Sequence, residues 1–318
     1  MDAVKTTLLC KRSDPTTRDK YGKSALDWAA TKGFNDVVVE LLKSTKMEDD
    51  KANEQALELA AKKGHLLVSI TLCEKIKDSK RRELAVSTIL FSAAAAASES
   101  TLVIEKLIKM VINPNHQDKN DRTALMLAVL NSKWLLFNKL LDLKANPDLQ
   151  VHKKRTALMM AAEMDNWASV GALLSANANP NIQDEQGYTA LHYAAEGVKS
   201  RSLQMLLGST SKATNPNVQD SGKRTALHIA LEKLTTSRHY GWFRKIIRNN
   251  IWHYLLQSGA RPDIQDEEDQ TPLHWAVRKN RFDIAQSLLK ASPSGRDGRD
   301  GQPGYPRRRR THPAAPCR

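Results

Sequence analysis

Apolar positions recur along the chain in blocks that polar turns separate. A typical block opens with Thr-Ala-Leu, continues with two alanines and, after a polar stretch, ends in a pair of leucines. Thr and Ser are favoured helix N-caps because their hydroxyl accepts a hydrogen bond from an unpaired amide. The alanines keep this first helix thin, and the leucines belong to a second helix. Each block is therefore predicted to form two helices.

The Thr-Ala-Leu signature returns with a period of about 33 residues, a length typical of helical repeats. Asn-Pro and similar turn sequences precede many of the blocks, as at Asn146-Pro147 and Asn179-Pro180. Self-similarity at this period indicates a solenoid, whose units must stack because none buries its apolar face alone. The eight copies of the signature lie at Ser24–Leu26, Gln55–Leu57, Thr88–Leu90, Thr123–Leu125, Thr156–Leu158, Thr189–Leu191, Thr225–Leu227 and Thr271–Leu273.

These blocks resemble the ankyrin repeat, most closely at Thr271–Ala276 and Asp184–Ala195. The resemblance covers about residues 2–291. It implies an all-α solenoid of helix-turn-helix units joined by hairpin-like loops, with a concave face that binds other proteins. We expect eight ankyrin-like repeats within residues 19–291, starting near residues 19, 50, 83, 118, 151, 184, 220 and 266.

Some positions depart from the family pattern. Lys154 and Lys223 stand where the family has a turn glycine, and lysine adopts positive φ less readily than aspartate, so we expect both hairpins to be distorted. The third unit, Thr88–Lys109, departs most, and its run of alanines predicts helix. Val151 replaces the loop aspartate that other units supply as Asp19, Asp118, Asp184, Asp220 and Asp266.

The two ends differ from the repeats. Residues 1–18 look like a half repeat, a second helix and turn, because Leu8-Leu9 precedes Leu41-Leu42 by one repeat length. An array that begins with half a unit exposes an apolar edge. Either nearby basic residues cap that edge or the chain is a fragment or isoform of a longer protein, and we favour the second interpretation.

Residues 292–318 contain four Gly-X-Y triplets followed by Arg307–Arg310. Four triplets are too few for a stable collagen helix, so we expect a disordered basic tail. A truncated fusion is the alternative.

Charge and cysteine content narrow the class of protein. Lys and Arg number 49 against 35 Asp and Glu, a net charge of +14, which favours anionic partners without choosing among them. No apolar run is long enough to span a membrane. The three cysteines suit neither a disulfide framework nor a metal site. We expect a cytoplasmic protein, with Arg307–Arg310 as an alternative nuclear import signal.

The resemblance implies that partners contact the loop tips and the exposed side of each first helix. In the fourth and fifth units, basic side chains outnumber acidic ones at these positions, which predicts an acidic partner; the alternative is a solvated loop rim. The candidate partner-binding residues are Lys119, Asn120, Arg122, His152, Lys153, Arg155, Glu185, Tyr188, Arg224 and Arg278.

The seventh unit is longer than the others and contains an insertion that mixes basic and aromatic residues. It is interpreted as a packed helix, a protein-binding spur or a nucleic-acid contact, with packing favoured. The candidate insertion-site residues are Arg238, Tyr240, Trp242, Arg244 and Lys245.

No motif for catalysis, phosphate binding or a metal is present in the sequence. His192, His228 and His274 occupy the same position in their repeats, three residues after the opening Thr. The resemblance implies that they form hydrogen bonds to loop backbone between units. They lie about one repeat apart, which is too far for them to bind one metal ion together. We predict a non-catalytic protein-binding scaffold without a cofactor. The alternatives are an adaptor for nucleic acid or an anionic membrane, and a targeting module of a larger protein such as a ubiquitin-ligase subunit.

Overall fold

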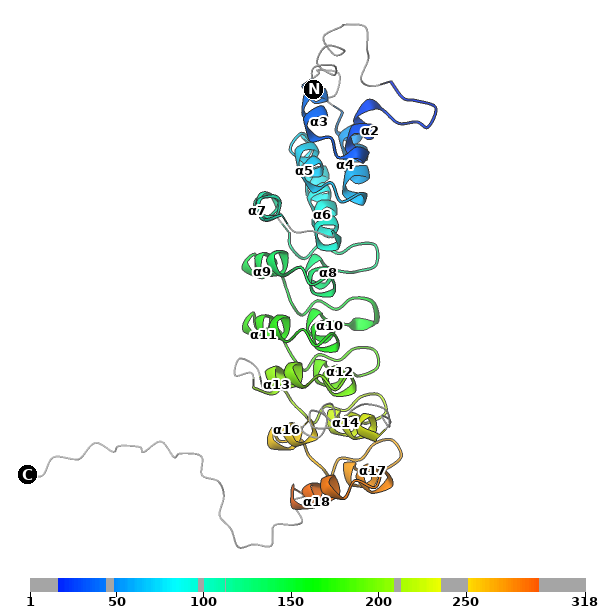
Figure 1. Cartoon of the computed structure of the whole chain (residues 1–318), viewed down its shortest axis with the longest axis vertical. Coiled ribbons are helices and arrows are strands. Elements are labelled where there is room, and N and C mark those ends of the chain that lie inside the picture. The colour runs from blue at the N-terminus through cyan, green and yellow to red at the C-terminus, as the bar shows by residue number, and fades with distance from the viewer. Residues whose placement is uncertain are drawn as a thin grey trace, which may run out of the picture.

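The computed structural model describes residues 17–43, 49–96, 100–111, 113–208, 213–235 and 251–291. These residues form sixteen α-helices in consecutive antiparallel pairs, stacked into one elongated array (Figure 1). The predicted half repeat before residue 17, the insertion-site residues and the basic tail lie outside the described residues. The all-α solenoid predicted from the repeats is confirmed.

The helices form two layers. The first helices of the pairs are α2 (Ala25–Lys32), α4 (Asp50–Lys62), α6 (Ser79–Ala95), α8 (Ala124–Leu130), α10 (Ala157–Glu163), α12 (Ala190–Glu196), α14 (Ala226–Thr235) and α17 (Pro272–Arg278). The second helices are α3 (Asn35–Leu41), α5 (Leu66–Cys73), α7 (Thr101–Met110), α9 (Trp134–Asp142), α11 (Trp167–Ser175), α13 (Ser200–Gly208), α16 (Ile251–Gln257) and α18 (Phe282–Ala291). Figure 1 shows the first helices on the side of the long loops and the second helices on the other side.

The Thr of the repeated signature caps its helix as expected. The hydroxyl of Thr123 accepts a hydrogen bond from the amide of Met126 at 3.3 Å, and Thr156 does the same for Met159. In the sixth unit the bond is reciprocated, because Nδ1 of His192 accepts from the amide of Thr189 at 3.1 Å. Each cap satisfies an amide that the helix itself leaves unpaired.

The second and third units begin differently from the others. Their first helices start at N-caps Asp49 and Asp78, so Thr88 lies inside α6 and donates its hydroxyl to the carbonyl of Leu84. Residues 74–78 join α5 to α6 without a long loop. This short connection is held by the carboxylate of Asp50, which accepts hydrogen bonds from the amides of Lys77 and Asp78. These bonds lower the pKa of Asp50. The extra helical turns therefore replace a loop at this boundary.

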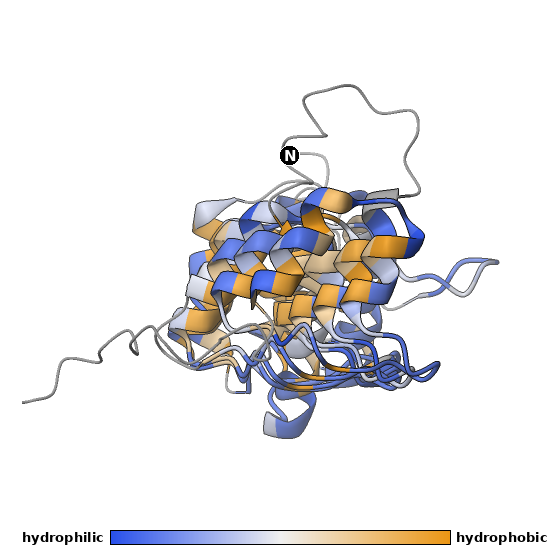
Figure 2. Cartoon of the chain, turned by 90° about the horizontal axis from the view of Figure 1, so that it is seen from below, coloured by the Kyte–Doolittle hydropathy of each residue, from blue (hydrophilic) through white to orange (hydrophobic). Residues whose placement is uncertain are grey.

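The core is a continuous layer of aliphatic side chains between the helices. It extends from Leu26 in the first pair to Leu288 in the last. Ala161 and Ala162, like Ala194 and Ala195, are fully buried, so neighbouring first helices can approach closely. Figure 2, a view along the stack, shows the apolar residues within the helical layers and the polar loops at one side. Leu and Ala thus supply a core that has few aromatic rings.

Buried histidines join successive units. Nε2 of His192 lies 3.3 Å from the carbonyl oxygen of Arg224, and Nε2 of His228 lies 3.2 Å from that of Gln270. With Nδ1 accepting from the N-cap amide, the neutral ring donates through Nε2 to the next unit. The inter-unit role implied by the family resemblance is confirmed for these two residues. Burial lowers the pKa of both rings, although the carbonyl bonds act in the opposite direction.

We expect stability to fall as the pH drops below about 6.5, the ordinary pKa of histidine. Because the folded state holds His192 and His228 at lowered pKa values, the unfolded chain binds protons first as the pH decreases. Each ring contributes a slope of at most about 1.4 kcal/mol per pH unit. Urea denaturation at pH 7.5 and 5.5 measures the loss.

Met126 and Met159 occupy the same position in their repeats as these histidines. Methionine is therefore a residue that this position accepts, and it serves as the non-titrating replacement. The double variant His192→Met, His228→Met is expected to lose part of the wild-type pH dependence between those two values. An unchanged dependence in this variant would show that other groups cause it.

Candidate functional site

Long loops before six of the first helices project from one side of the stack (Figure 1). We call them fingers and number them by unit: finger one (17–24), four (113–123), five (143–156), six (176–189), seven (213–225) and eight (258–271). A single carboxylate organises each of the five fingers that contain the loop aspartate. In finger six, Oδ1 of Asp184 accepts the amides of Gln186 and Tyr188 at 2.9 and 2.8 Å. The equivalent residues are Asp19, Asp118, Asp220 and Asp266.

Glutamine side chains tie fingers five to eight together. Nε2 of Gln150 donates to the carbonyl of Gln183 at 3.0 Å, Gln183 donates to Gln219 at 2.8 Å, and Gln219 donates to Gln265 at 3.1 Å. Backbone bonds add to this ladder, as the amide of Glu267 donates to the carbonyl of Gly222. Each loop thus satisfies its neighbour's polar backbone, which gives the fingers a fixed order and spacing.

Finger five departs from the common pattern. Val151 offers no carboxylate, and residues His152–Lys154 form a short 3-10 turn, with Lys153 at φ 63° and Lys154 at φ 57°. Lys223 also has a positive φ of 55°, yet its finger retains the bonds to Asp220. Of the two hairpins expected to be distorted, only the one without a loop aspartate departs from the common arrangement. Lysine at the turn position is thus compatible with the common arrangement in the finger that has the loop aspartate.

A groove of about 600 Å³ lies between fingers four and five. Near the start of these two fingers, the amide of Asn146 donates to Oδ1 of Asn115 at 2.7 Å and joins finger five to finger four. Gln117 bonds within its own finger, to the carbonyl of Asp121. The structure therefore brings five of the ten predicted partner-binding residues to one groove: Lys119, Asn120, Arg122, Lys153 and Arg155.

The two arginines of this groove are held by acidic neighbours. Nε and one terminal nitrogen of Arg122 donate to Oδ2 of Asp118 at 2.9 and 2.7 Å. Partial burial opposes ionisation of Asp118, but the bonds from Arg122 outweigh it and hold its pKa below the usual value. Arg155 pairs with Glu163 and stacks on Tyr193, 4.7 Å from the ring centre. Both guanidinium groups are thereby fixed in orientation.

The lysines of the groove are different. Lys119 and Lys153 are exposed, and within the described part of the chain neither side chain forms an ion pair. Lys154 is exposed beside Lys153. Among the described residues that line the groove, Asp121 carries the acidic side chain, and Glu163 nearby is already paired with Arg155. The groove therefore presents unpaired ammonium groups between two fixed guanidinium groups.

Two of the other predicted residues, Tyr188 and Arg224, lie in fingers six and seven. Arg224 bridges Asp220 at 3.0 Å, Glu232 at 3.3 Å and the hydroxyl of Tyr188 at 3.1 Å. Tyr188 also stacks on His192, with ring centres 5.4 Å apart. Their partners thus give Tyr188 and Arg224 a structural role between the sixth and seventh units.

Three further predicted positions complete the comparison with the sequence. Glu185 is exposed at the tip of finger six, and Arg278 bonds Gln270 at 2.7 Å over the Trp275 ring. The side chain of His152 lies outside the described residues, as do all of Arg238, Tyr240, Trp242, Arg244 and Lys245.

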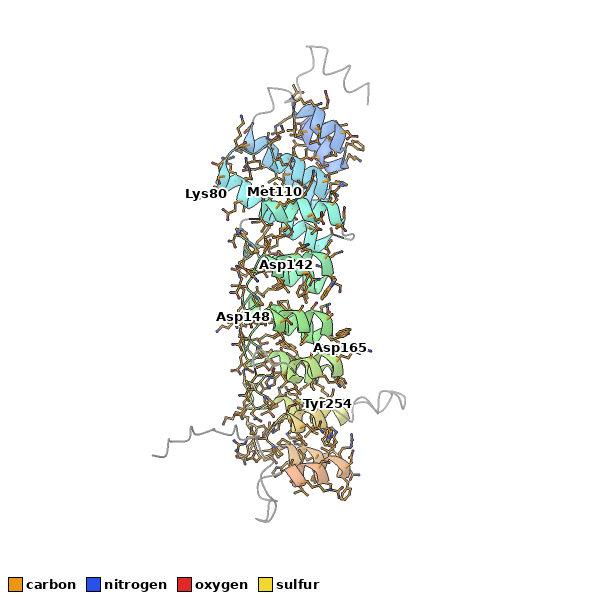
Figure 3. All side chains as sticks on the ribbon, turned by 90° about the vertical axis from the view of Figure 1, so that its left-hand side faces the viewer. Lys80, Met110, Asp142, Asp148, Asp165 and Tyr254 are labelled. Carbon is orange, nitrogen blue, oxygen red and sulfur yellow. The ribbon has the colours of Figure 1, made fainter. Side chains whose placement is uncertain are left out.

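Sequence reasoning missed a pocket at the opposite edge of the stack. It measures about 340 Å³, lies between the α8–α9 and α10–α11 turns, and is lined by Trp134, Phe137 and Met164 among others. Figure 3 places Asp148 of finger five and Asp165 of the α10–α11 turn at opposite edges. Trp134 and Trp167 are each about half exposed and lie one repeat apart. This spacing of two tryptophans was the feature of the sequence that could have indicated the pocket.

The described residues contain no group of three or more potential metal-ligating side chains. Burial raises the pKa of the Cys73 thiol to about 11, which keeps it protonated and poorly nucleophilic at neutral pH. None of the described helices combines the length and apolar character needed to cross a bilayer. The fingers present positively charged groups and hydrogen-bond donors.

A family profile of ankyrin repeats in three copies matches residues 133–220, 158–239 and 198–298. The chain belongs to the ankyrin repeat family. An ankyrin repeat protein of Acanthamoeba polyphaga mimivirus is 42% identical over 41 residues, 13% of this chain and 10% of the relative. The 26S proteasome non-ATPase regulatory subunit 10 of Dictyostelium discoideum is 39% identical over 46 residues, 14% of this chain and 20% of the relative. The chain thus matches a fifth or less of each relative's length.

Ankyrin repeats are protein–protein interaction modules, and the family is typically non-catalytic. In this ankyrin repeat protein the fingers supply both inter-unit bonds and exposed side chains. The same loops therefore join neighbouring units and present exposed polar side chains.

Replacing a finger aspartate is expected to destabilise the stack. Asp220, with a side chain only 1% exposed, is the acceptor for two finger amides and Arg224. Asp220→Ala leaves these donors unpaired and is expected to lower the free energy of unfolding by about 2 kcal/mol. Urea denaturation followed by circular dichroism measures the change.

Asp220→Asn keeps an amide oxygen for the two backbone donors and serves as the matched control. Its loss of stability is expected to be smaller than that of Asp220→Ala. Equal stability of Asp220→Ala and wild type would disprove the organising role of the carboxylate.

Proposed function

We propose that this ankyrin repeat protein is a non-catalytic scaffold that binds an acidic segment of a partner protein in the groove between fingers four and five. The observation that supports the proposal is the convergence of Lys119, Lys153, Arg122 and Arg155 on a groove of about 600 Å³. Loops held by internal hydrogen bonds lose little conformational freedom on binding. The site is thus pre-organised for carboxylates.

The four cations have different parts in this proposal. Lys119 and Lys153 approach the partner's carboxylates as mobile point charges, because neither is engaged within the described chain. Asp118 and Glu163 orient the guanidinium groups and leave their remaining N–H groups to donate to the partner. Complementary charge of this kind mainly increases the association rate and the selectivity for acidic segments.

The second candidate function is that of an adaptor that binds nucleic acid or an anionic membrane, and the net charge of +14 favours it. Binding of that kind would fall steeply with salt and would depend on many lysines rather than on one groove. A targeting module within a larger assembly is also compatible with peptide binding, and one matched relative is named as a proteasome regulatory subunit. We place the interaction in the cytoplasm as part of the same proposal.

Reversing the two free lysines of the groove is the direct test. The variant Lys119→Glu, Lys153→Glu is expected to bind a fluorescent acidic peptide of alternating Asp and Glu about tenfold or more weakly than wild type, since two attractive contacts become repulsive. Fluorescence anisotropy at about 150 mM salt, where exposed charges are only partly screened, gives the dissociation constants.

Lys62→Glu, Lys63→Glu is the matched control, because it changes the net charge equally at two exposed lysines at the end of α4. Its affinity is expected to stay near that of wild type. Equal weakening in both variants would show that net charge, rather than the groove, attracts the peptide. A parallel titration with single-stranded DNA distinguishes the nucleic-acid candidate.

A further inference from the structure

The exposed tips of fingers five to eight carry charges of alternating sign. Finger five is positive, finger six negative, finger seven positive and finger eight negative. Within the described residues none of these side chains forms an ion pair with another part of the chain. The residues are Lys153 and Lys154 in finger five, Glu185 in finger six, Lys223 in finger seven, and Glu267, Glu268 and Asp269 in finger eight.

This order of charges is fixed by the loop framework. The Gln150, Gln183 and Gln219 side chains each donate to the backbone of the next finger, so the four tips are joined in sequence. Backbone bonds between the tips reinforce the order, as the amide of Glu185 donates to the carbonyl of Lys153 at 3.1 Å. The charges therefore form a pre-organised row along one edge of the stack rather than four independent loops.

A row of this kind can meet a second copy of itself in two ways that place tip against tip. If the two stacks are parallel, each finger meets its own equivalent, and like charges oppose each other. If the stacks are antiparallel, finger five meets finger eight of the other copy and finger six meets finger seven. Opposite charges then face each other at every position, as a two-fold interface requires of a self-complementary surface.

We propose that two copies of this chain associate antiparallel through the tips of fingers five to eight, about a two-fold axis between fingers six and seven. The strongest contacts join the lysines of finger five to Glu267 and Glu268 of finger eight. The weaker contact joins Glu185 to Lys223. The second copy is favoured as the occupant because its charge sequence complements this row in both halves at once.

The proposed ion pairs between the two copies involve exposed side chains, so we expect a weak dimer whose stability depends on salt. Exposed ion pairs are individually weak and are screened at distances beyond about 8 Å at physiological salt. Several pairs acting together produce association that is concentration-dependent and that disappears at high salt. Lys153 also belongs to the groove between fingers four and five, so an acidic partner and the second copy compete there. Finger eight belongs to the dimer alone.

Sedimentation velocity of the full chain tests the proposal. Wild type is expected to shift from monomer to dimer as concentration rises at about 50 mM salt, and to remain monomeric at about 500 mM. A basic variant, Glu267→Lys with Glu268→Lys, and an acidic variant, Lys153→Glu with Lys154→Glu, each place like charges opposite one another. Each alone is expected to dimerise at least about tenfold more weakly than wild type.

Two combinations make the test specific for the antiparallel arrangement. An equimolar mixture of the basic and acidic variants is expected to form a heterodimer, because each finger again meets an opposite charge. The variant that carries all four substitutions is expected to dimerise more tightly than either double variant, because finger five becomes negative and finger eight positive, although Asp269 partly offsets the two new lysines of finger eight. Lys62→Glu, Lys63→Glu, away from the fingers, is expected to dimerise like wild type.

A wild type that stays monomeric at low salt would overturn the proposal, as would failure of the four-substitution variant to dimerise. The basic variant separates this proposal from the acidic-partner function, because its groove lysines are intact. If it binds the acidic peptide but does not dimerise, both proposals stand. If it dimerises like wild type, the finger pairing is wrong whatever the peptide does.

Discussion

The structure depends on hydrogen bonds that each unit makes to the backbone of the next. A single helix pair is too small to bury its apolar face, and its loop leaves polar groups that need partners. His192 and His228 donate across unit boundaries from the interior, while Gln183 and Gln219 do so at the fingers. Stacking therefore satisfies apolar and polar requirements together.

The pairing of charges explains why the basic residues of the fingers are not equivalent. Asp118 holds Arg122 and Asp220 holds Arg224, so these guanidinium groups help to maintain the fingers. Finger five has no such carboxylate because Val151 stands in its place. Arg155 pairs with Glu163 instead, whereas Lys153 and Lys154 stay exposed, as Lys119 and Lys223 do in fingers that have the aspartate.

Much of this arrangement could be predicted from the sequence, since the regular spacing of the Thr-Ala-Leu signature and its threonine caps define the helix pairs. The early start of α6 at Ser79 could not, because it depends on Asp50 holding the preceding turn through tertiary bonds. The groove residues were also identified, but the internal pairing of Arg122 and Arg155 was not. Residue type predicts a charge, whereas its availability depends on side chains brought near by folding.

Fingers four and five are joined near their first residues, and within the described part of the chain Gln117 bonds inside its own finger instead of extending the glutamine ladder to finger five. The glutamine ladder that joins the other tips begins only at Gln150. The order of fingers five to eight therefore depends on bonds between their tips, whereas Asn115 links finger four to finger five. Sequence changes at the tip of finger four consequently leave the glutamine ladder of the following fingers intact, so this loop can diversify without loss of the bonds that order its neighbours.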